Sequence, residues 1–113
     1  MAGIHLFDHD THVQVVEPGH VVFDQGDSGG EMFAVLDGVV ELRRDGELIH
    51  TAEKGDVFGE MALIDDSPRS ARAQAVSEAR VVAVDRKRFM FLVQEHPTFA
   101  LQVMASMADK LRR

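Results

Sequence analysis

The sequence predicts a mainly β domain: a β-roll, or jelly-roll-like barrel, interrupted by a short helix and closed by two C-terminal helices. Between residues 13 and 84, short β-rich runs are separated by Gly and Asp turns roughly every eight to twelve residues, as in β-sandwiches and barrels. Helical periodicity begins only after Asp85. The 113 residues are enough for one hydrophobic core but not for two, so residues 1–113 are expected to form a single domain.

The composition is that of an ordinary soluble globular protein, with 45% hydrophobic and 27% charged residues. No apolar run approaches the roughly 20 residues that span a bilayer, and no signal-peptide pattern opens the chain, so we expect no direct membrane insertion. Because the chain has no cysteine, disulfides, thiolate catalysis and cysteine-ligated iron–sulfur clusters are excluded. This absence fits a cytoplasmic location.

The charge balance argues against a nucleic-acid partner. Nineteen acidic and twelve basic residues give a formal net charge of −7, which repels nucleic acid unless one face is strongly basic. The dense basic groups are residues 86–88 and the terminal Lys110, Arg112 and Arg113. We interpret both groups as flanks of helix ends.

The first residues are expected to dock as a single turn through Ile4, Leu6 and Phe7. The segment Asp8-His9-Asp10-Thr11-His12 contains imidazoles and carboxylates that can bind a metal. A polar loop is the favoured interpretation, because no third ligand cluster supports a metal site. We therefore expect no metal.

The β-rich runs before the central stretch follow one another with clear turn signals. The predicted strands are residues 13–16, 21–23, 32–36, 39–43 and 48–52. Asp37-Gly38 and Asp45-Gly46 are the best local hairpin signals in the chain. Val39, Val40 and Leu42 are expected either to face a ligand or to belong to the core.

The central stretch, residues 58–71, combines two kinds of chemistry. Gly59 opens one expected turn of helix, whose free N–H groups favour an anion. Pro68 stiffens the approach to Arg69, a side chain suited to gripping two phosphate oxygens. Glu60 is unsuited to a phosphate and is expected to accept hydrogen bonds from a neutral hydroxyl. A small ligand with a phosphate and a sugar follows from this pairing.

The same stretch resembles the phosphate-binding cassette of cyclic nucleotide-binding domains, the family of the catabolite activator protein, the regulatory subunit of protein kinase A and cyclic-nucleotide-gated channels. The family pattern F-G-E-[LM]-A-L-[IL]-x-x-x-P-R-[SA]-A is filled at every fixed position. The resemblance implies that Glu60 takes the ribose 2′-hydroxyl and Arg69 the cyclic phosphate, with backbone N–H groups near Gly59, Ala62 and Ser70. The ligand-binding residues that it implies are Phe58, Gly59, Glu60, Met61, Ala62, Arg69, Ser70 and Ala71.

The resemblance extends over residues 13–113, because turn glycines also fall at Gly19, Gly26, Gly38 and Gly55. The chain departs from the family pattern at Arg72, where Thr, Ser or a bulkier residue is common; this bears on base preference. Residues 73–76 and 80–84 are the last predicted strands, so the cassette interrupts a sheet, as suits a ligand site in the mouth of a roll.

Two helices complete the chain. Asp85 is a good N-cap for residues 86–95, and Pro97 suits the first position of a helix that runs to the end. Its apolar stripe, Phe99, Val103, Met107 and Leu111, is widened by Leu101, Met104, Ala105 and Ala108. So broad a face is expected to contact the core, a bound base, a second subunit in a homodimer, or a partner helix.

The leading functional hypothesis is a non-enzymatic cytoplasmic receptor for a cyclic nucleotide that changes conformation on binding. Family transcription factors continue into a DNA-binding helix-turn-helix, which this sequence lacks. The signal is therefore expected to pass to a regulated protein partner, unless the chain is a piece of a larger protein. The alternative is a small cupin-like metal-dependent barrel enzyme. It is disfavoured because the six histidines lack the His-x-His spacing of such barrels. A cassette retained only for structure is disfavoured by the intact Glu60 and Arg69.

The sequence favours cAMP over cGMP. In cGMP-preferring relatives a Thr commonly follows the cassette Arg, whereas Ser70 carries a hydroxyl that rotates more freely and discriminates weakly. Met104, Ala105 and Met107 are expected to supply apolar base contacts, which offer nothing to the polar edge of guanine.

Overall fold

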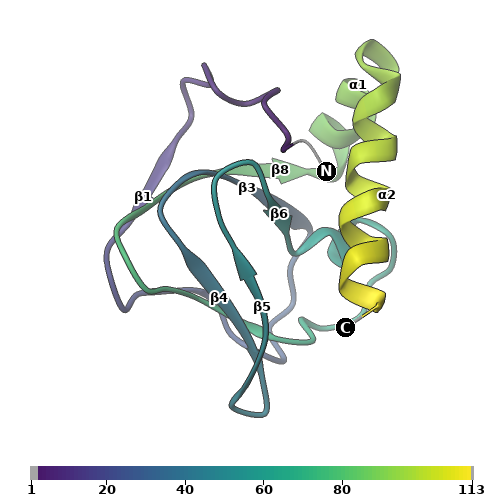
Figure 1. The fold of residues 1–113 in the computed structure, drawn as a ribbon. Coiled ribbons are helices and arrows are strands. Elements are labelled where there is room, and N and C mark those ends of the chain that lie inside the picture. Colours follow the sequence, from purple (N-terminus) through teal and green to yellow (C-terminus); the bar gives the residue numbers. More distant parts are fainter. Residues whose placement is uncertain (1–2, 113) are drawn as a thin grey trace.

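The computed structural model describes residues 3–112 and consists of two four-stranded antiparallel sheets followed by two helices (Figure 1). The first sheet has the order β1-β8-β3-β6 and the second β2-β7-β4-β5. The strands are β1 (Gln14–Val16), β2 (Val21–Phe23), β3 (Glu31–Asp37), β4 (Val40–Arg44), β5 (Glu47–Ala52), β6 (Val57–Phe58), β7 (Arg72–Ala75) and β8 (Ala79–Asp85). The predicted β-roll with C-terminal helices is confirmed.

The first sheet is covered on both faces, and β3 shows this most clearly. Successive side chains of a strand point to opposite faces. Phe33 and Val35 belong to a core cluster shared with the second sheet, while Met32 and Ala34 belong to a cluster with the helices. Strand β3 is therefore buried on both sides, which explains its almost continuous apolar sequence.

The helices α1 (Arg86–Glu95) and α2 (Pro97–Leu111) cover the outer face of the first sheet (Figure 1). The side chain of Asp85 accepts a hydrogen bond from Arg88 N at 2.8 Å, as expected of an N-cap. The predicted N-terminal turn docks here too: the rings of Phe7 and Phe99 meet edge to face with centroids 5.7 Å apart. Within residues 3–112, no helix is long and apolar enough to cross a membrane.

One of the two predicted hairpins was wrong, and one strand was not predicted. Asp45-Gly46 does form a hairpin turn, between β4 and β5, with φ of 52° and 84°. Asp37-Gly38 does not, because β3 and β4 lie in different sheets and the turn carries the chain from one to the other. A Cβ on Gly38 would lie 2.2 Å from Glu78 O, so close backbone approach also requires glycine there. The short strand β6, which pairs with β3, was not predicted.

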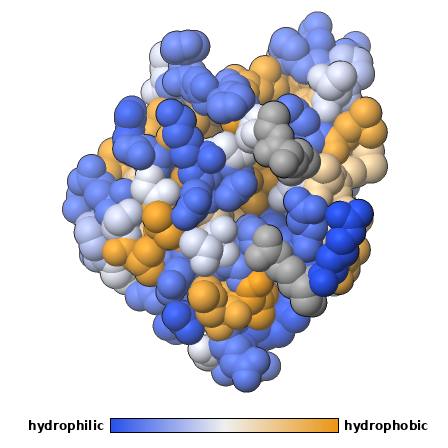
Figure 2. All heavy atoms as spheres, in the orientation of Figure 1, coloured by the Kyte–Doolittle hydropathy of each residue, from blue (hydrophilic) through white to orange (hydrophobic). Residues whose placement is uncertain are grey.

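The apolar stripe expected on α2 was partly wrong. Phe99 and Val103 are buried and Met107 packs against them, but Leu111 is 86% exposed. A four-residue spacing drifts by about 40° per step around a helix of 3.6 residues per turn, so Leu111 has left the core-facing side. Leu101 and Met104 are exposed as well. In Figure 2, hydrophobic residues accordingly reach the surface on the side of the molecule where α2 lies in Figure 1.

Candidate ligand-binding site

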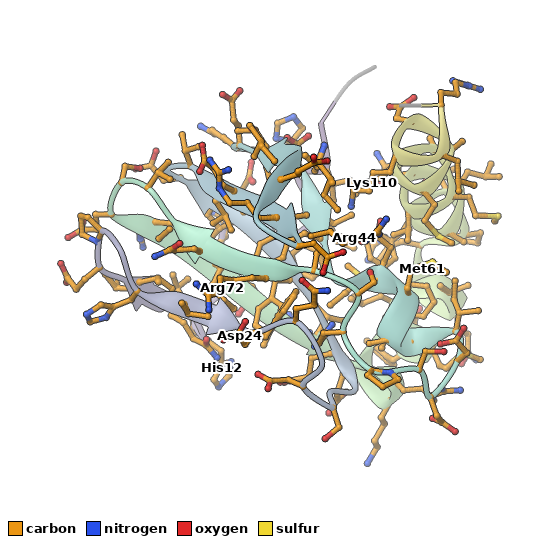
Figure 3. All side chains as sticks on the ribbon, turned by 90° about the horizontal axis from the view of Figure 1, so that it is seen from below. His12, Asp24, Arg44, Met61, Arg72 and Lys110 are labelled. Atoms are coloured by element: carbon orange, nitrogen blue, oxygen red, sulfur yellow. The ribbon has the colours of Figure 1, made fainter. Side chains whose placement is uncertain are left out.

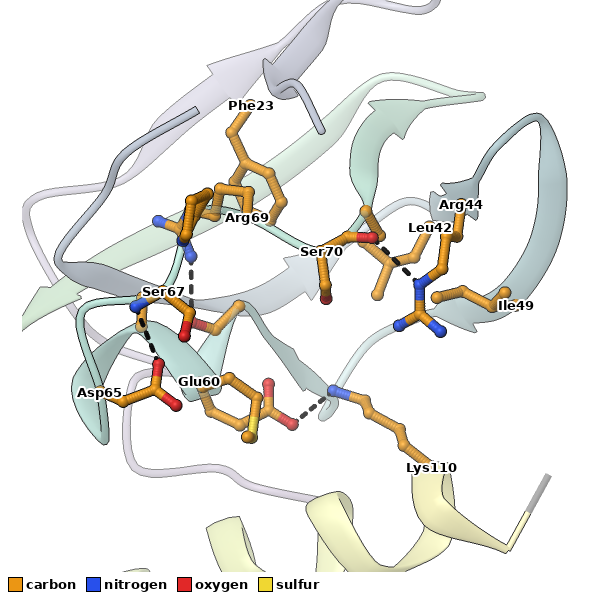
Figure 4. Close-up of a pocket in the computed structure, with 15 residues that line it drawn as sticks. Phe23, Leu42, Arg44, Ile49, Glu60, Asp65, Ser67, Arg69, Ser70 and Lys110 are labelled. Atoms are coloured by element: carbon orange, nitrogen blue, oxygen red, sulfur yellow. Dashed lines mark hydrogen bonds and ion pairs between the residues drawn. The ribbon is translucent and has the colours of Figure 1, made fainter. Parts of the chain in front are cut away.

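A cavity of about 290 Å³ lies where the cassette meets the second sheet and the end of α2. Its walls come from segments distant in sequence: β2, β4, β5, the region from Gly59 to Ala71, and the last turn of α2 (Figure 4). The lining residues are Phe23, Leu42, Arg44, Ile49, Gly59, Glu60, Met61, Ala62, Asp65, Ser67, Pro68, Arg69, Ser70, Ala71 and Lys110.

The expected helix turn is present as the 3₁₀ helix η1 (Glu60–Leu63), and Gly59 is its N-cap. Gly59 has φ 76°, in the left-handed region that favours glycine. A Cβ at this position would also lie 2.8 Å from the Nη1 atom of Arg69. Glycine is therefore required twice over, once for the turn and once to let the guanidinium approach the backbone.

Arg69 is 8% exposed, and its guanidinium is held by neutral groups. Nη1 donates to Gly59 O at 3.0 Å, Nη2 donates to Glu31 O at 2.8 Å, and the group lies 4.1 Å from the centre of the Phe23 ring. Among the described residues, Nε has no hydrogen-bond partner. Burial lowers the pKa of Arg69, against the opposing charges of Glu31 and Asp27. An arginine nevertheless stays protonated, so a buried cation faces the cavity.

The backbone of Arg69 is fixed by the loop between β2 and β3. Arg69 N donates to Asp27 O at 2.7 Å and Gly26 N donates to Arg69 O at 2.8 Å. Gly29 lies against the guanidinium, since a Cβ there would come within 2.6 Å of Nη2. Backbone and side chain of this arginine are therefore both positioned by contacts within the protein.

Glu60 is 3% exposed and is paired with Lys110 from the last turn of α2. Lys110 Nζ lies 2.6 Å from Glu60 Oε1 and also donates to Val57 O at 2.9 Å. One carboxylate oxygen remains to accept a further hydrogen bond. The pair links the cassette directly to the end of the last helix, as the dashed line in Figure 4 shows.

The wall on the side of the second sheet combines two apolar side chains with a cation. Leu42 from β4 and Ile49 from β5 line the cavity beside Arg44, whose Nε donates to Ser70 O at 3.1 Å. The site thus offers a buried guanidinium, a buried carboxylate and an apolar strand surface within one cavity. This set suits a small molecule with an anionic group, a hydroxyl-bearing group and a flat apolar group.

Comparison with known proteins identifies the family. Residues 13–96 match the family described as "Cyclic nucleotide-binding domain". The chain belongs to the cyclic nucleotide-binding domain family. Its relatives include a "CRP-like cAMP-activated global transcriptional regulator" of Mycobacterium tuberculosis, 31% identical over a 100-residue alignment that covers 84% of this chain and 45% of the regulator. The chain therefore spans about half the length of this curated relative.

Two solved structures share this cyclic nucleotide-binding domain fold. The catabolite activator protein of Thermus thermophilus superposes with a TM-score of 0.79 at 32% identity, covering 88% of this chain and 49% of that one. A structure described as "A cyclic-GMP-dependent signalling pathway regulates bacterial phytopathogenesis" superposes with a TM-score of 0.77 at 26% identity. It covers 95% of this chain and 90% of that chain.

The predicted site residues of this cyclic nucleotide-binding domain converge, with one exception. The cavity-lining residues include Gly59, Glu60, Met61, Ala62, Arg69, Ser70 and Ala71. Phe58 instead lies in the core, where its ring stacks on Phe33 with centroids 5.3 Å apart. Phe58 therefore supports the cassette from the core and does not line the cavity. Of the three strand residues considered, Leu42 lines the cavity, while Val40 is fully buried in the core.

Several cavity residues could not be predicted from the sequence. Arg44, Ile49 and Phe23 come from strands whose pairing the sequence does not specify, and Lys110 comes from the polar side of α2. The predicted base contacts Met104, Ala105 and Met107 are not among the lining residues. The sequence predicts that Arg72 bears on base preference, but Arg72 forms a two-bond ion pair with Asp24 at 3.0 Å. Figure 3 shows this pair away from Met61 and Lys110.

Proposed function

We propose that this domain is a receptor for a cyclic purine nucleotide and that it signals to a partner protein through a change in conformation. Arg69 binds the cyclic phosphate, Glu60 accepts the ribose 2′-hydroxyl, and the strand surface of Leu42 and Ile49 supports the base. Ser70, Ala71 and the backbone of Gly59 and Ala62 complete the phosphate side, with Met61 at the rim and Phe58 behind. We place this receptor in the cytoplasm.

The observation that carries the proposal is the state of Arg69. A buried guanidinium with no carboxylate within pairing distance among the described residues, and with Nε lacking a hydrogen-bond partner, is costly unless an anion completes its coordination. A phosphate supplies both the charge and the acceptor oxygens. The family membership of the chain and the phosphate-binding pattern of the cassette support the same assignment.

The conformational signal is proposed to travel through α2. Glu60 is the ribose acceptor in this proposal, and it is already bonded to Lys110 on the last turn of α2. A hydroxyl that bonds to the other oxygen of this carboxylate alters the contact that holds the helix end. Because ligand binding then changes the energy of one helix position relative to another, it can shift their populations.

Ligand binding should stabilise the fold. A ligand at about one hundred times its dissociation constant adds roughly 2.7 kcal/mol to the free energy of unfolding. For a domain of this size the melting temperature should rise by on the order of 10 °C. Differential scanning fluorimetry and calorimetry with cAMP and cGMP measure this. No shift with either nucleotide at millimolar concentration would contradict the receptor proposal.

We propose a modest preference for cAMP. Ser70 is a weak discriminator of guanine, and adenine is the base with the lower desolvation cost in a site with an apolar wall. The expected difference is about ten-fold, or roughly 1.4 kcal/mol. A competition titration in which cGMP binds as tightly as cAMP, or more tightly, would overturn this preference.

The exposed side of α2 is proposed to contact a second copy of the domain or a partner helix. Leu101, Met104, Ala108 and Leu111 follow a three-four-three spacing, the seam of a left-handed coiled coil, and the first two and the last are exposed. If the seam forms a homodimer, sedimentation equilibrium should give a dimer that Leu101→Glu dissociates. A protein that stays monomeric across the micromolar concentration range would exclude the homodimer and leave a partner helix as the proposed contact of α2.

Two other roles are disfavoured. Among residues 3–112, no group of three or more His, Cys, Asp or Glu side chains lies close enough to hold a metal ion, so the described residues offer no candidate centre for a cupin-like enzyme. The net charge of −7 favours a protein partner over nucleic acid. Salt-sensitive binding of the domain to duplex DNA would contradict that choice.

A further inference from the structure

Arg44 is a cation of the cavity to which neither the sequence pattern nor the phosphate and ribose assignments give a role. It ends β4 and lines the cavity, and its Nε donates to Ser70 O at 3.1 Å. That hydrogen bond fixes one edge of the guanidinium. In Figure 4 the terminal nitrogens point away from Ser70, toward the side of the cavity that Lys110 enters.

The position of Arg44 relative to the apolar wall determines what it meets. Leu42 and Arg44 are two residues apart on one strand, and residues at this spacing share a face of the sheet. Ile49 completes the wall from the neighbouring strand β5. In the proposed function, Arg69 and Glu60 take the phosphate and the sugar, so this wall is left for the base. The guanidinium of Arg44 then lies at an edge of that base.

A guanidinium has only donors, so it distinguishes the two purines. Guanine presents two adjacent acceptors, N7 and O6, and arginine pairs with both at once. Adenine presents N7 beside an amino group, which is itself a donor and cannot accept from arginine.

We propose that Arg44 is a specificity-determining residue that recognises the N7 and O6 acceptors of a purine base. The inference rests on the proposed function and adds a determinant to it. Arg44 favours guanine, whereas the cost of desolvation favours adenine. Because the two effects oppose each other, the affinity for cGMP stays within about ten-fold of the affinity for cAMP. The cAMP preference of the domain should therefore increase when Arg44 is removed.

The test is a set of calorimetric titrations with cAMP, cGMP and cyclic IMP on the wild type and Arg44→Ala. Cyclic IMP keeps N7 and O6 but lacks the 2-amino group of guanine, so it separates recognition of the two acceptors from any contact with the amino group. Arg44→Ala should weaken the binding of cGMP and of cyclic IMP by about ten-fold each, and the binding of cAMP by less than about three-fold. Arg44→Lys should show the same selective loss, because an ammonium does not match two adjacent acceptors as a planar guanidinium does.

Arg43→Ala is the matched control. It removes the same charge from the same strand, but Arg43 is not a lining residue and bonds to Gly46 O and Glu41. It should leave the ratio of the affinities unchanged. Melting temperatures without nucleotide show whether the variants are folded.

The outcomes separate the two proposals. If the wild type binds none of the three nucleotides, the receptor proposal fails and this inference with it. If the wild type binds but Arg44→Ala weakens all three equally, or none, then Arg44 acts through general electrostatics or not at all, and only this inference is overturned. Wild-type affinity for cGMP and cyclic IMP in the Arg44→Lys variant would also overturn this inference.

Discussion

Replacing Arg69 with Ala should abolish nucleotide binding at micromolar protein concentrations. Arg69 is the buried cation of the cavity, and breaking a buried charge pair costs about 2–5 kcal/mol. The dissociation constant should therefore rise by between roughly thirty-fold and several thousand-fold, as measured by calorimetry. Arg69→Lys should recover only part of the affinity, because lysine keeps the charge but not the two-pronged geometry.

Arg72→Ala is the control for this substitution. Arg72 lies three residues further along the chain and pairs with Asp24 outside the cavity, so its loss should change the affinity little. Arg69 also bonds the carbonyls of Gly59 and Glu31, so the variant is expected to lose some stability. Circular dichroism without ligand separates unfolding from lost binding. A folded Arg69→Ala protein with near-native affinity would show that the phosphate assignment is wrong.

Replacing Glu60 should have a smaller effect than replacing Arg69. Its proposed partner is a neutral hydroxyl, and a hydrogen bond to a charged group is worth about 1.5–3 kcal/mol. The structure adds a second consequence that the sequence did not suggest, because Lys110 loses its carboxylate partner and keeps its hydrogen bond to Val57 O.

The cassette could be predicted from the sequence because part of its geometry is local. A left-handed Gly59 and the helix turn that follows place Glu60, and Pro68 directly precedes Arg69. Such constraints act between neighbours in the chain. They leave a recognisable pattern of residues.

The rest of the cavity could not be predicted because it depends on pairings between distant segments. Arg44 reaches the site only because β4 pairs with β7, and Lys110 only because α2 crosses the first sheet and ends beside η1. The same limit explains the error at Asp37-Gly38. An Asp-Gly pair specifies a turn, but the sheet that the next strand joins is decided by tertiary packing.

Replacing Phe99 with Ala should destabilise the domain by about 3–5 kcal/mol, a large share of the roughly 5–15 kcal/mol that holds a domain of this kind together. Phe99 is 1% exposed and packs against the rings of Phe7 and Phe89, with centroids 5.7 Å and 5.6 Å away. It thereby joins the N-terminal turn, α1 and α2. Urea denaturation followed by circular dichroism measures the loss.

Leu101→Ala tests whether the loss of stability in Phe99→Ala comes from the burial of the replaced side chain. Leu101 lies on the same helix but is 65% exposed, so its replacement should change the free energy of unfolding of the monomeric domain by about 0.5 kcal/mol or less. Equal losses at the two positions would mean that α2 does not dock through Phe99. The comparison also bears on ligand binding, because α2 carries Lys110 to the cavity. Since undocking the helix removes Lys110 from Glu60, residual folded Phe99→Ala protein should bind nucleotide more weakly than Leu101→Ala protein does.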